Sequence, residues 1–309
     1  MTRAGRPDRT VSRRSTEPPA ERVRHRLAAV AGERVARQMP SGYHRLGRVL
    51  LIQRPDALAP YDSLLGIAWQ KELGVTTVLV KNGPIEGELR TPRVRCVAGG
   101  PTETEVVEHG VRWRFDAARI MFAAGNRTER IRVGRLVQPG ESVVDLFAGI
   151  GYFAIPAALL GRAECVWAVE KNPVAVGYLR ENAIVNGVAD RVRVVPGDNR
   201  SVDLPAASFD RAFLGYLPSA VPWVERAVPL LRPSGGWIHV HTVADVRSPL
   251  VEAATAVERS VAAAGGHTLE PARARLVKPY GPGRNHVVVD VRVATGAEGS
   301  RTVDRGLRA

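Results

Sequence analysis

The stretch that most constrains this chain is ESVVDLFAGIG, residues 141–151, which the apolar run YFAIPAALLG follows. The segment VVDL has the length and composition of a short buried strand, and Gly149 and Gly151 allow a tight turn before a helix begins. Such a turn leaves unpaired backbone N–H groups at the carboxyl end of a strand, where open α/β sheets bind nucleotides. We therefore expect a ligand site at this turn.

The residues of the loop indicate the kind of ligand. Its pattern, DxFAGxG, differs from the GxGxxG that binds a pyrophosphate, and no lysine of a phosphate-binding loop follows it. The acid Asp145 with two glycines suits a ligand that presents an amine and a sugar, such as S-adenosylmethionine. A glycine-rich turn without a ligand is the alternative.

A second acidic residue supports a nucleoside ligand. The strand CVWAVE ends on Glu170, 19 residues after Gly151, and an acid at this spacing accepts hydrogen bonds from ribose hydroxyls. Asn172 and Pro173 have the residue types of a helix N-cap and a first helical residue. The alternative, that Glu170 only caps this helix, is weaker because Asp145 and the glycines agree with the ribose assignment.

The later segments continue the alternation of strands and helices. RVRVVPGD ends at Asp198 and Asn199, which are placed to reach an adenine amine, and FDRAFLGYLPSA ends in a proline-containing turn at the same cleft. The apolar strands WIHVHTV and HVVVDVRV follow, with a helical stretch at 249–264 between them. The pattern predicts an α/β fold with a doubly wound, mostly parallel sheet over residues 139–295, and a disordered tail at 296–309.

The chain before this sheet divides into three parts. Residues 1–40 form a basic arm, expected to be disordered up to residue 20, and a short amphipathic helix; an arm that contacts RNA phosphates is the alternative. Residues 41–117 combine a strand LGRVLLI, a helix SLLGIAWQKEL, a strand VTTVLV and a hairpin EVVEHGVRWRFD, which predicts a small α/β module. Residues 118–138 form a connecting loop and helix.

The composition limits the function classes. The net charge of +13 would suggest nucleic acid, but residues 1–48 alone hold 12 Arg and 4 acidic residues, so the globular part is only mildly basic. Cys96 and Cys165 lie far apart and the histidines are scattered, which excludes a disulfide framework and makes a metal site unexpected. Without an apolar run of about 18 residues or a signal-peptide pattern, we expect a cytoplasmic protein that does not bind membranes.

Five blocks resemble one known family in the same order. They are VVDLFAGIGYFAIPAA, AVEKNPVAVGYLRENAIVNGVADRVRVVPGDNR, DRAFLGYLPSA, GGWIHVHTV and VKPYGPGRNHVVVD. The blocks are similar to the family that holds the tRNA guanine-37 N1-methyltransferases and the wybutosine-synthesising 3-amino-3-carboxypropyltransferases. The resemblance covers about residues 43–293. It implies a Rossmann-like, class I methyltransferase sheet that takes S-adenosylmethionine as co-substrate and needs no metal.

Two blocks resemble the aminocarboxypropyl branch more than the methyltransferases. MFAAGNRTER and LGYLPSA are similar to its FSxGNxxER and LGxxPSS, whereas the Arg and the Asn-Leu-Pro turn of the methyltransferases are missing. The resemblance implies that Arg130 binds the methionine carboxylate, Glu170 the ribose, and Asp198 with Asn199 the adenine. A solvated helix face is the alternative for Arg130. The expected cofactor contacts are Arg130, Asp145, Phe147, Gly149, Gly151, Glu170, Asn172, Asp198 and Asn199.

The expected reaction transfers the 3-amino-3-carboxypropyl group to a nucleophile and releases methylthioadenosine. Ala123 and Ala220 replace two serines of the branch, which leaves the acceptor open. The chain also resembles the nocardicin aminocarboxypropyltransferase (isonocardicin synthase), which alkylates a phenol oxygen of a β-lactam. We therefore favour a small phenolic acceptor in antibiotic biosynthesis.

Other acceptors and a base are also considered. A tRNA of the wybutosine pathway is the main alternative; a tRNA guanine methyltransferase and a non-catalytic RNA-binding relative are less favoured. A phenol has a pKa near 10, so its attack benefits from a base or a positive field. The candidates are His241, at the end of a strand, and Tyr216 or Arg130 at the cleft. A histidine satisfied inside the core is the alternative for His241.

Overall fold

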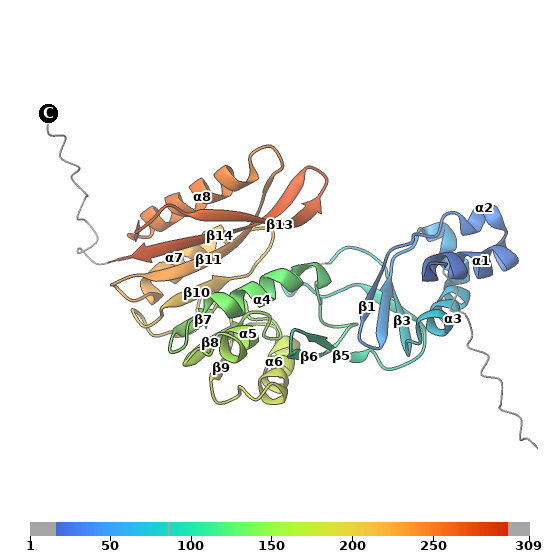
Figure 1. Cartoon of the computed structure of the whole chain (residues 1–309), viewed down its shortest axis with the longest axis horizontal. Coiled ribbons are helices and arrows are strands. Elements are labelled where there is room, and N and C mark those ends of the chain that lie inside the picture. Colours follow the sequence, from blue (N-terminus) through green and yellow to red (C-terminus); the bar gives the residue numbers. More distant parts are fainter. Residues whose placement is uncertain (1–16, 86, 296–309) are drawn as a thin grey trace, which may run out of the picture. The chain divides into compact units, whose positions relative to one another are not determined.

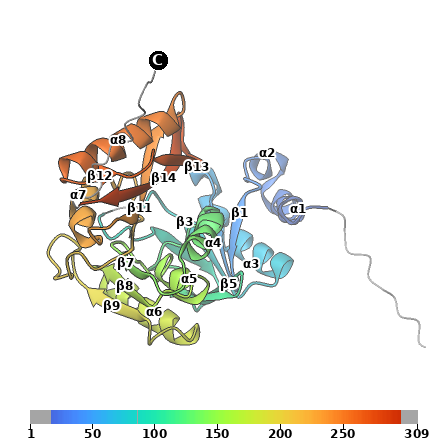
Figure 2. The same cartoon turned by 60° about the vertical axis from the view of Figure 1, so that its left-hand side comes forward.

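The computed structural model describes residues 17–85 and 87–295. They form two compact units: residues 17–84 with 93–102 make up the first, and residues 85, 87–92 and 103–295 make up the second. Figures 1 and 2 show the elements of both units, coloured along the sequence. Most of the expected disordered arm (1–16) and the tail at 296–309 lie outside the described residues.

The first unit is a four-stranded sheet with packed helices. Its elements are α1 (Pro19–Ala31), α2 (Glu33–Ala36), β1 (Tyr43–Leu46), β2 (Val49–Ile52), the 3-10 helix η1 (Asp56–Tyr61), α3 (Asp62–Leu73), β3 (Thr77–Lys81) and β4 (Val94–Ala98). The strand order is β1-β2-β3-β4, with β2 and β3 parallel and the other pairs antiparallel. Leu27, Leu50, Trp69 and Val78 join α1, α3 and the sheet in one apolar core.

Two glycines divide elements that the sequence predicted to be continuous. LGRVLLI was expected to be one strand, but the chain turns at Gly47 (φ 56°), so that β1 and β2 pair as a hairpin. The helix expected before residue 40 breaks at Gly32 (φ 82°) into α1 and α2. Val30, predicted on the apolar face of that helix, is 67% exposed. Both predictions were wrong because a left-handed glycine overrides the apolar periodicity.

The second unit contains the large sheet. Its elements are β5 (Glu103–Glu108), β6 (Val111–Asp116), η2 (Ala124–Asn126), α4 (Arg127–Leu136), β7 (Ser142–Asp145), α5 (Ala154–Leu159), β8 (Cys165–Glu170), α6 (Pro173–Val185), β9 (Val192–Pro196), β10 (Arg211–Leu214), η3 (Val221–Trp223), α7 (Val224–Ala227), η4 (Val228–Leu230), β11 (Gly236–Asp245), α8 (Pro249–Ala263), β12 (His267–Thr268), β13 (Arg273–Gly281) and β14 (Arg284–Ala294). The strand order is β12-β14-β11-β10-β7-β8-β9, and β13 pairs with β14.

The topology of this sheet confirms the predicted α/β, mostly parallel fold. Strands β9, β8, β7, β10 and β11 are mutually parallel, whereas β12, β13 and β14 form antiparallel pairs at one side. The chain runs outward from β7 to β9 and then crosses back to β10. This reversal opens a crevice at the carboxyl ends of β7 and β10, which is where doubly wound sheets bind ligands.

The hairpin of β5 and β6 was predicted correctly, but its placement in a module ending at residue 117 differs from the structure. It belongs to the second unit, because two asparagines of α6 bind its backbone. Asn182 Oδ1 accepts a hydrogen bond from the N–H of Arg114 (2.7 Å), and Asn186 Oδ1 accepts one from the N–H of Arg112 (2.9 Å). These long-range contacts leave no local signal in the sequence.

Candidate functional site

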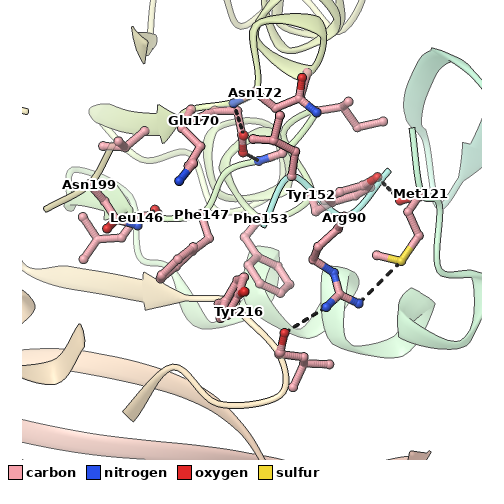
Figure 3. A pocket seen from close by; sticks show the side chains of 18 of the residues that line it. Arg90, Met121, Leu146, Phe147, Tyr152, Phe153, Glu170, Asn172, Asn199 and Tyr216 are labelled. Atoms are coloured by element: carbon pink, nitrogen blue, oxygen red, sulfur yellow. Dashed lines mark hydrogen bonds between the residues drawn. The ribbon is translucent and has the colours of Figure 1, made fainter. Parts of the chain in front are cut away.

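A pocket lies at the carboxyl ends of the parallel strands of the second unit. Polar side chains such as Glu170 and Asn199 and aromatic rings such as Phe147 and Tyr216 line it together. Loops that follow β7, β8, β9 and β10 contribute most of its lining. Figure 3 shows the pocket, with Asn199 and Leu146 at one side and Arg90 and Met121 at the other.

The glycine turn after β7 has the conformation that its sequence predicted. Gly149 and Gly151 have φ values of 56° and 100°, and a Cβ on Gly151 would lie 2.4 Å from a side-chain carbon of Ile155. Below the turn, the fully buried Asp145 accepts a hydrogen bond from the N–H of Phe147 (3.1 Å). Burial raises the pKa of Asp145 to about 7. Asp145 and Gly151 therefore shape the loop from below and do not line the pocket.

Glu170 ties the glycine turn to the start of α6. Its Oε2 accepts the N–H of Gly149 and its Oε1 accepts the N–H of Asn172, each at 2.7 Å. Burial raises the pKa of Glu170, and these backbone hydrogen bonds oppose the shift. Asn172 caps α6, since its Oδ1 accepts the N–H of Val174 at 3.0 Å. The Glu170 carboxylate is thus fixed at the pocket wall, with further lone pairs available to hydroxyl donors.

In the loop after β9, the side chain of Asp198 is occupied by ion pairs, whereas that of Asn199 keeps an open acceptor. The carboxylate of Asp198 is paired with Arg200 and, at 3.3 Å, with Lys171, and these partners hold the pKa of Asp198 well below its usual range. Asn199 is 7% exposed; its Nδ2 donates to the backbone oxygen of Leu146 at 2.7 Å. Its Oδ1 is buried and has no partner among the described residues. This oxygen is an open acceptor for an amine.

Arg130 lines the pocket but is occupied by other contacts. It is 1% exposed, and its Nε and Nη2 donate to Glu108 Oε2 at 3.1 and 2.6 Å. Its Nη1 donates to the backbone oxygen of Ala123 at 3.0 Å, and its guanidinium lies 4.5 Å from the ring centre of Phe122. Its positive charge is therefore neutralised inside the protein.

Three aromatic rings meet at the pocket wall. The ring centres of Phe147 and Tyr216 are 5.2 Å apart, and Trp223 lies 5.2 Å from Phe147 and 5.3 Å from Tyr216. All three line the pocket. Planar, apolar walls of this kind suit a nucleobase, because every base has a π-face that stacks on aromatic side chains.

His241 lies on β11 at the base of the pocket and is 2% exposed. Its Nδ1 is 2.9 Å from Nε2 of His286, and its Nε2 has no partner among the described residues. Burial, and then the neighbouring His286 and Arg132, lower the pKa of His241 well below its usual value. The imidazole is therefore neutral at pH 7, the state in which a ring nitrogen can accept a proton.

The structure brings most of the sequence-derived candidates to one pocket. Those that line it are Arg130, Phe147, Gly149, Glu170, Asn172, Asp198, Asn199, Tyr216 and His241. The sequence did not predict several other lining residues, among them Arg90, Met121, Tyr152 and Trp223. Tyr152 directly follows the glycine turn and could have been found there, whereas no motif surrounds Arg90.

Metal and membrane sites were also sought. Within residues 17–85 and 87–295, no group of His, Cys, Asp and Glu side chains is arranged to hold a metal ion. None of the described helices combines the length and apolar character that a membrane span requires.

Comparison with known proteins shows which family the chain resembles. A family model described as "TRM5/TYW2 methyltransferase domain" matches residues 104–267, and one described as "TYW2 N-terminal domain" matches residues 23–102. The tRNA(Phe) (4-demethylwyosine(37)-C(7)) aminocarboxypropyltransferase of Pyrococcus horikoshii is 34% identical over 88% of this chain and 96% of its own length.

Solved structures agree with this result. TYW2 from P. horikoshii, solved in complex with MeSAdo, has a TM-score of 0.77 and 32% identity over 90% of this chain and all of that chain. TYW2 from M. jannaschii, solved in complex with AdoMet, has a TM-score of 0.66 and 29% identity over 82% of this chain and 99% of that chain. The predicted co-substrate, S-adenosylmethionine, is thereby confirmed.

Proposed function

Because this chain belongs to the TRM5/TYW2 methyltransferase family, we propose that it transfers the 3-amino-3-carboxypropyl group of S-adenosylmethionine to the modified base at position 37 of tRNA(Phe). The observation that carries the proposal is the end-to-end match to the P. horikoshii enzyme named for this reaction, which includes both units of the chain. As predicted, the chain is a transferase that uses S-adenosylmethionine. This similarity supports tRNA as the acceptor.

The preference for a phenolic β-lactam acceptor was wrong. Two relatives that match most of the chain, from P. horikoshii and from Methanocaldococcus jannaschii, are aminocarboxypropyltransferases of tRNA(Phe). The exchange of two serines for Ala123 and Ala220 had suggested a different acceptor. Those small changes do not outweigh a similarity that extends over the N-terminal unit.

The wall residues divide the work of holding the adenosine. The Glu170 carboxylate accepts hydrogen bonds from the ribose hydroxyls, and Oδ1 of Asn199 accepts one from the adenine amine. Asp198, already paired with Lys171 and Arg200, orients the loop that carries Asn199. Phe147, in the turn after β7, stacks against the adenine ring. Gly149 allows the close approach of the backbone to the sugar.

The reaction itself requires alignment and removal of one proton. Bound S-adenosylmethionine supplies an activated γ-carbon: a bond forms from C7 of the base, the carbon–sulfur bond breaks, and neutral methylthioadenosine leaves. The proton on C7 then goes to a base, and the neutral imidazole of His241, with its free Nε2, is the candidate. Tyr216 is part of the aromatic wall and positions the ring of the tRNA base that accepts the group. Holding the reactants in line supplies most of the rate.

Mass spectrometry of modified tRNA tests this proposal. Purified protein is incubated with S-adenosylmethionine and tRNA(Phe) that contains 4-demethylwyosine, beside a matched tRNA with unmodified guanosine. We expect the first tRNA to gain the mass of the aminocarboxypropyl group and methylthioadenosine to appear in equal amount. Gain of a methyl group on the guanosine tRNA would instead show a methyltransferase. Absence of any product on either tRNA would refute the proposal.

A further inference from the structure

Two histidines of β11 lie on the same face of the sheet but have different partners. Side chains alternate along a strand, so His239 and His241, two residues apart, share one face. Nε2 of His239 accepts a hydrogen bond from Nη1 of Arg211 at 2.7 Å, because a guanidinium has no acceptor, and its Nδ1 lies 2.5 Å from Oδ1 of Asp290. Both nitrogens of His239 are therefore occupied, and its proton is on Nδ1.

His241 has another histidine as its partner. β11 and β14 are antiparallel neighbours (Figure 1), and His286 of β14 stands opposite Val243, two residues beyond His241. In this diagonal arrangement Nδ1 of His241 lies 2.9 Å from Nε2 of His286, and the two ring centres are 5.0 Å apart. The ring centre of Phe153 lies 5.1 Å from that of His241. The imidazole of His241 is thus oriented by two neighbouring rings.

The outer nitrogens of this histidine pair have no partner. Nε2 of His241 and Nδ1 of His286 are buried and lack a hydrogen-bond partner within residues 17–85 and 87–295. A buried polar atom without a partner costs free energy unless a ligand reaches it. His241 lines the pocket, whereas His286 does not. A ligand in the pocket can therefore reach the pair at Nε2 of His241.

The contact between the two neutral rings admits two arrangements of the protons. In the first, His241 donates its Nδ1–H to His286 and keeps a lone pair on Nε2. In the second, His286 donates, and His241 carries its proton on Nε2. Only the first gives a base that can accept a proton from the pocket. The sulfonium of S-adenosylmethionine favours this arrangement, because a positive charge in the pocket attracts a lone pair and repels an N–H.

The surroundings keep both rings neutral. Burial, and then the charges of Lys278 and Arg275 on β13, lower the pKa of His286 to about 4. Burial also lowers the pKa of His241. The charged and titratable groups that face the pair are His239, Asp290, Arg132, Lys278 and Arg275. Because only a neutral imidazole has an acceptor nitrogen, His286 can take the N–H of His241 at pH 7.

We propose that His286 is a positioning residue for the transfer step: it accepts the Nδ1–H of His241 and so holds the Nε2 lone pair of that histidine toward the tRNA base. The inference deepens the proposed function and rests on it. After the new carbon–carbon bond has formed, the C7–H bond breaks, its proton moves to Nε2 of His241, and its electron pair returns to the ring of the tRNA base. The resulting imidazolium keeps its Nδ1–H on His286 and loses the added proton to water after the product leaves.

A neutral partner affects the base differently from a carboxylate. Burial lowers the pKa of His239, and the neighbouring Asp290 carboxylate opposes that shift. His286 offers His241 an acceptor without a negative charge, and therefore leaves its pKa low. The base should accordingly stay neutral, and able to accept a proton, to below pH 6.5.

Nitrogen-15 NMR of the full chain labelled at histidine measures the tautomers directly. Spectra are recorded at pH 8 with S-adenosylmethionine bound, and His241→Gln and His286→Gln assign the signals. We expect His241 and His286 each to carry one proton, on Nδ1. A proton on Nε2 of His241 would overturn the proposal, whatever acceptor the enzyme uses.

Single-turnover transfer to tRNA(Phe) that contains 4-demethylwyosine measures the effect on the reaction. His286→Leu removes the acceptor, His286→Gln replaces it by an amide oxygen, and His286→Glu replaces it by a carboxylate. His267→Leu removes a histidine of β12 that does not line the pocket and is the matched control. Calorimetry with S-adenosylmethionine shows that each variant is folded.

We expect His286→Leu to lower the rate roughly 10- to 100-fold, the usual effect of leaving a buried N–H without a partner. Its affinity for S-adenosylmethionine should stay that of wild type. His286→Gln should restore most of the rate, and His267→Leu should change nothing. His286→Glu should be active at pH 8 and lose activity toward pH 6.5, because a carboxylate raises the pKa of His241.

Three kinetic results would overturn the proposal. Equal loss of rate in His286→Leu and His286→Gln, with weaker binding of S-adenosylmethionine, would make His286 a packing residue. A loss from His286→Leu that is as large in the His241→Gln background as in wild type would show that His286 acts independently of His241. A pH-independent rate of His286→Glu between pH 8 and 6.5 would exclude the contact. If wild type transfers nothing to tRNA, the proposed function fails, and the tautomers alone decide the role of His286.

Discussion

Replacing Glu170 by Gln should weaken every ligand that contains the ribose. Both carboxylate oxygens of Glu170 accept backbone N–H groups at 2.7 Å, from Gly149 and from Asn172. An amide has one oxygen, so in Glu170→Gln one of these N–H groups would face an NH₂ group. The variant also loses the charged acceptor for the ribose. A hydrogen bond to a charged group contributes about 1.5–3 kcal/mol, which corresponds to about 10- to 150-fold in affinity.

Calorimetry on two ligands measures this effect. The affinities for S-adenosylmethionine and for methylthioadenosine should fall by the same factor, because both ligands contain the ribose. Glu164→Gln, an exposed glutamate just before β8, is the control with the same chemical change and should bind both ligands normally. A urea titration checks that Glu170→Gln is folded. Wild-type affinity in a folded Glu170→Gln protein, or loss of S-adenosylmethionine alone, would refute the ribose assignment.

Three further predictions follow from buried polar groups. Burial raises the pKa of Asp145 from 3.8 to about 7, so its contribution to stability is present below pH 4 and is lost as the pH rises to 7. In urea unfolding, the free energy of unfolding of Asp145→Asn should therefore rise relative to that of wild type over this range, by on the order of 4 kcal/mol at pH 8. A difference that does not change with pH would contradict the shift. His241→Gln should bind S-adenosylmethionine normally but lose most transfer activity. The rate of the wild-type enzyme should stay constant from pH 8 to 6.5, because the lowered pKa of His241 keeps the imidazole neutral. A rate that falls with a midpoint near pH 7 would exclude His241 as the base. Asn182→Ala should lower the free energy of unfolding by about 2–4 kcal/mol, since the backbone groups of Arg114 and Ile150 lose their hydrogen-bond partner. A loss below about 0.5 kcal/mol would mean that water replaces the side chain.

The part of the site that the sequence predicted is the part built from local segments. Gly149 and Asn199 lie in the loops after two parallel strands, and Glu170 is the last residue of a third. Strands of apolar residues can be recognised from their own composition. Because the carboxyl ends of parallel strands meet at one edge, the order of these residues was enough to place them in one pocket. The sheet and the pocket at its edge could therefore be predicted together.

The remaining features depend on residues that are distant in the chain. The neutralisation of Arg130 requires Glu108, 22 residues earlier, and the pairing of His241 requires His286, 45 residues later. Neither pair forms a motif, and in each case the residue type alone fits several roles. The hairpin of β5 and β6 was recognised from its alternation, but its attachment to α6 was not, because Asn182 and Asn186 resemble ordinary polar helix residues.

This division has a chemical consequence for the family. The adenosine contacts are the same whether the methyl group or the aminocarboxypropyl group is transferred, because both reactions begin from the same sulfonium. The choice between them depends on which carbon lies in line with the acceptor, and hence on how the methionine tail is held. The residues that set the reaction are therefore expected where the methionine tail lies, and exchanging them should alter the product before it alters the affinity for adenosine.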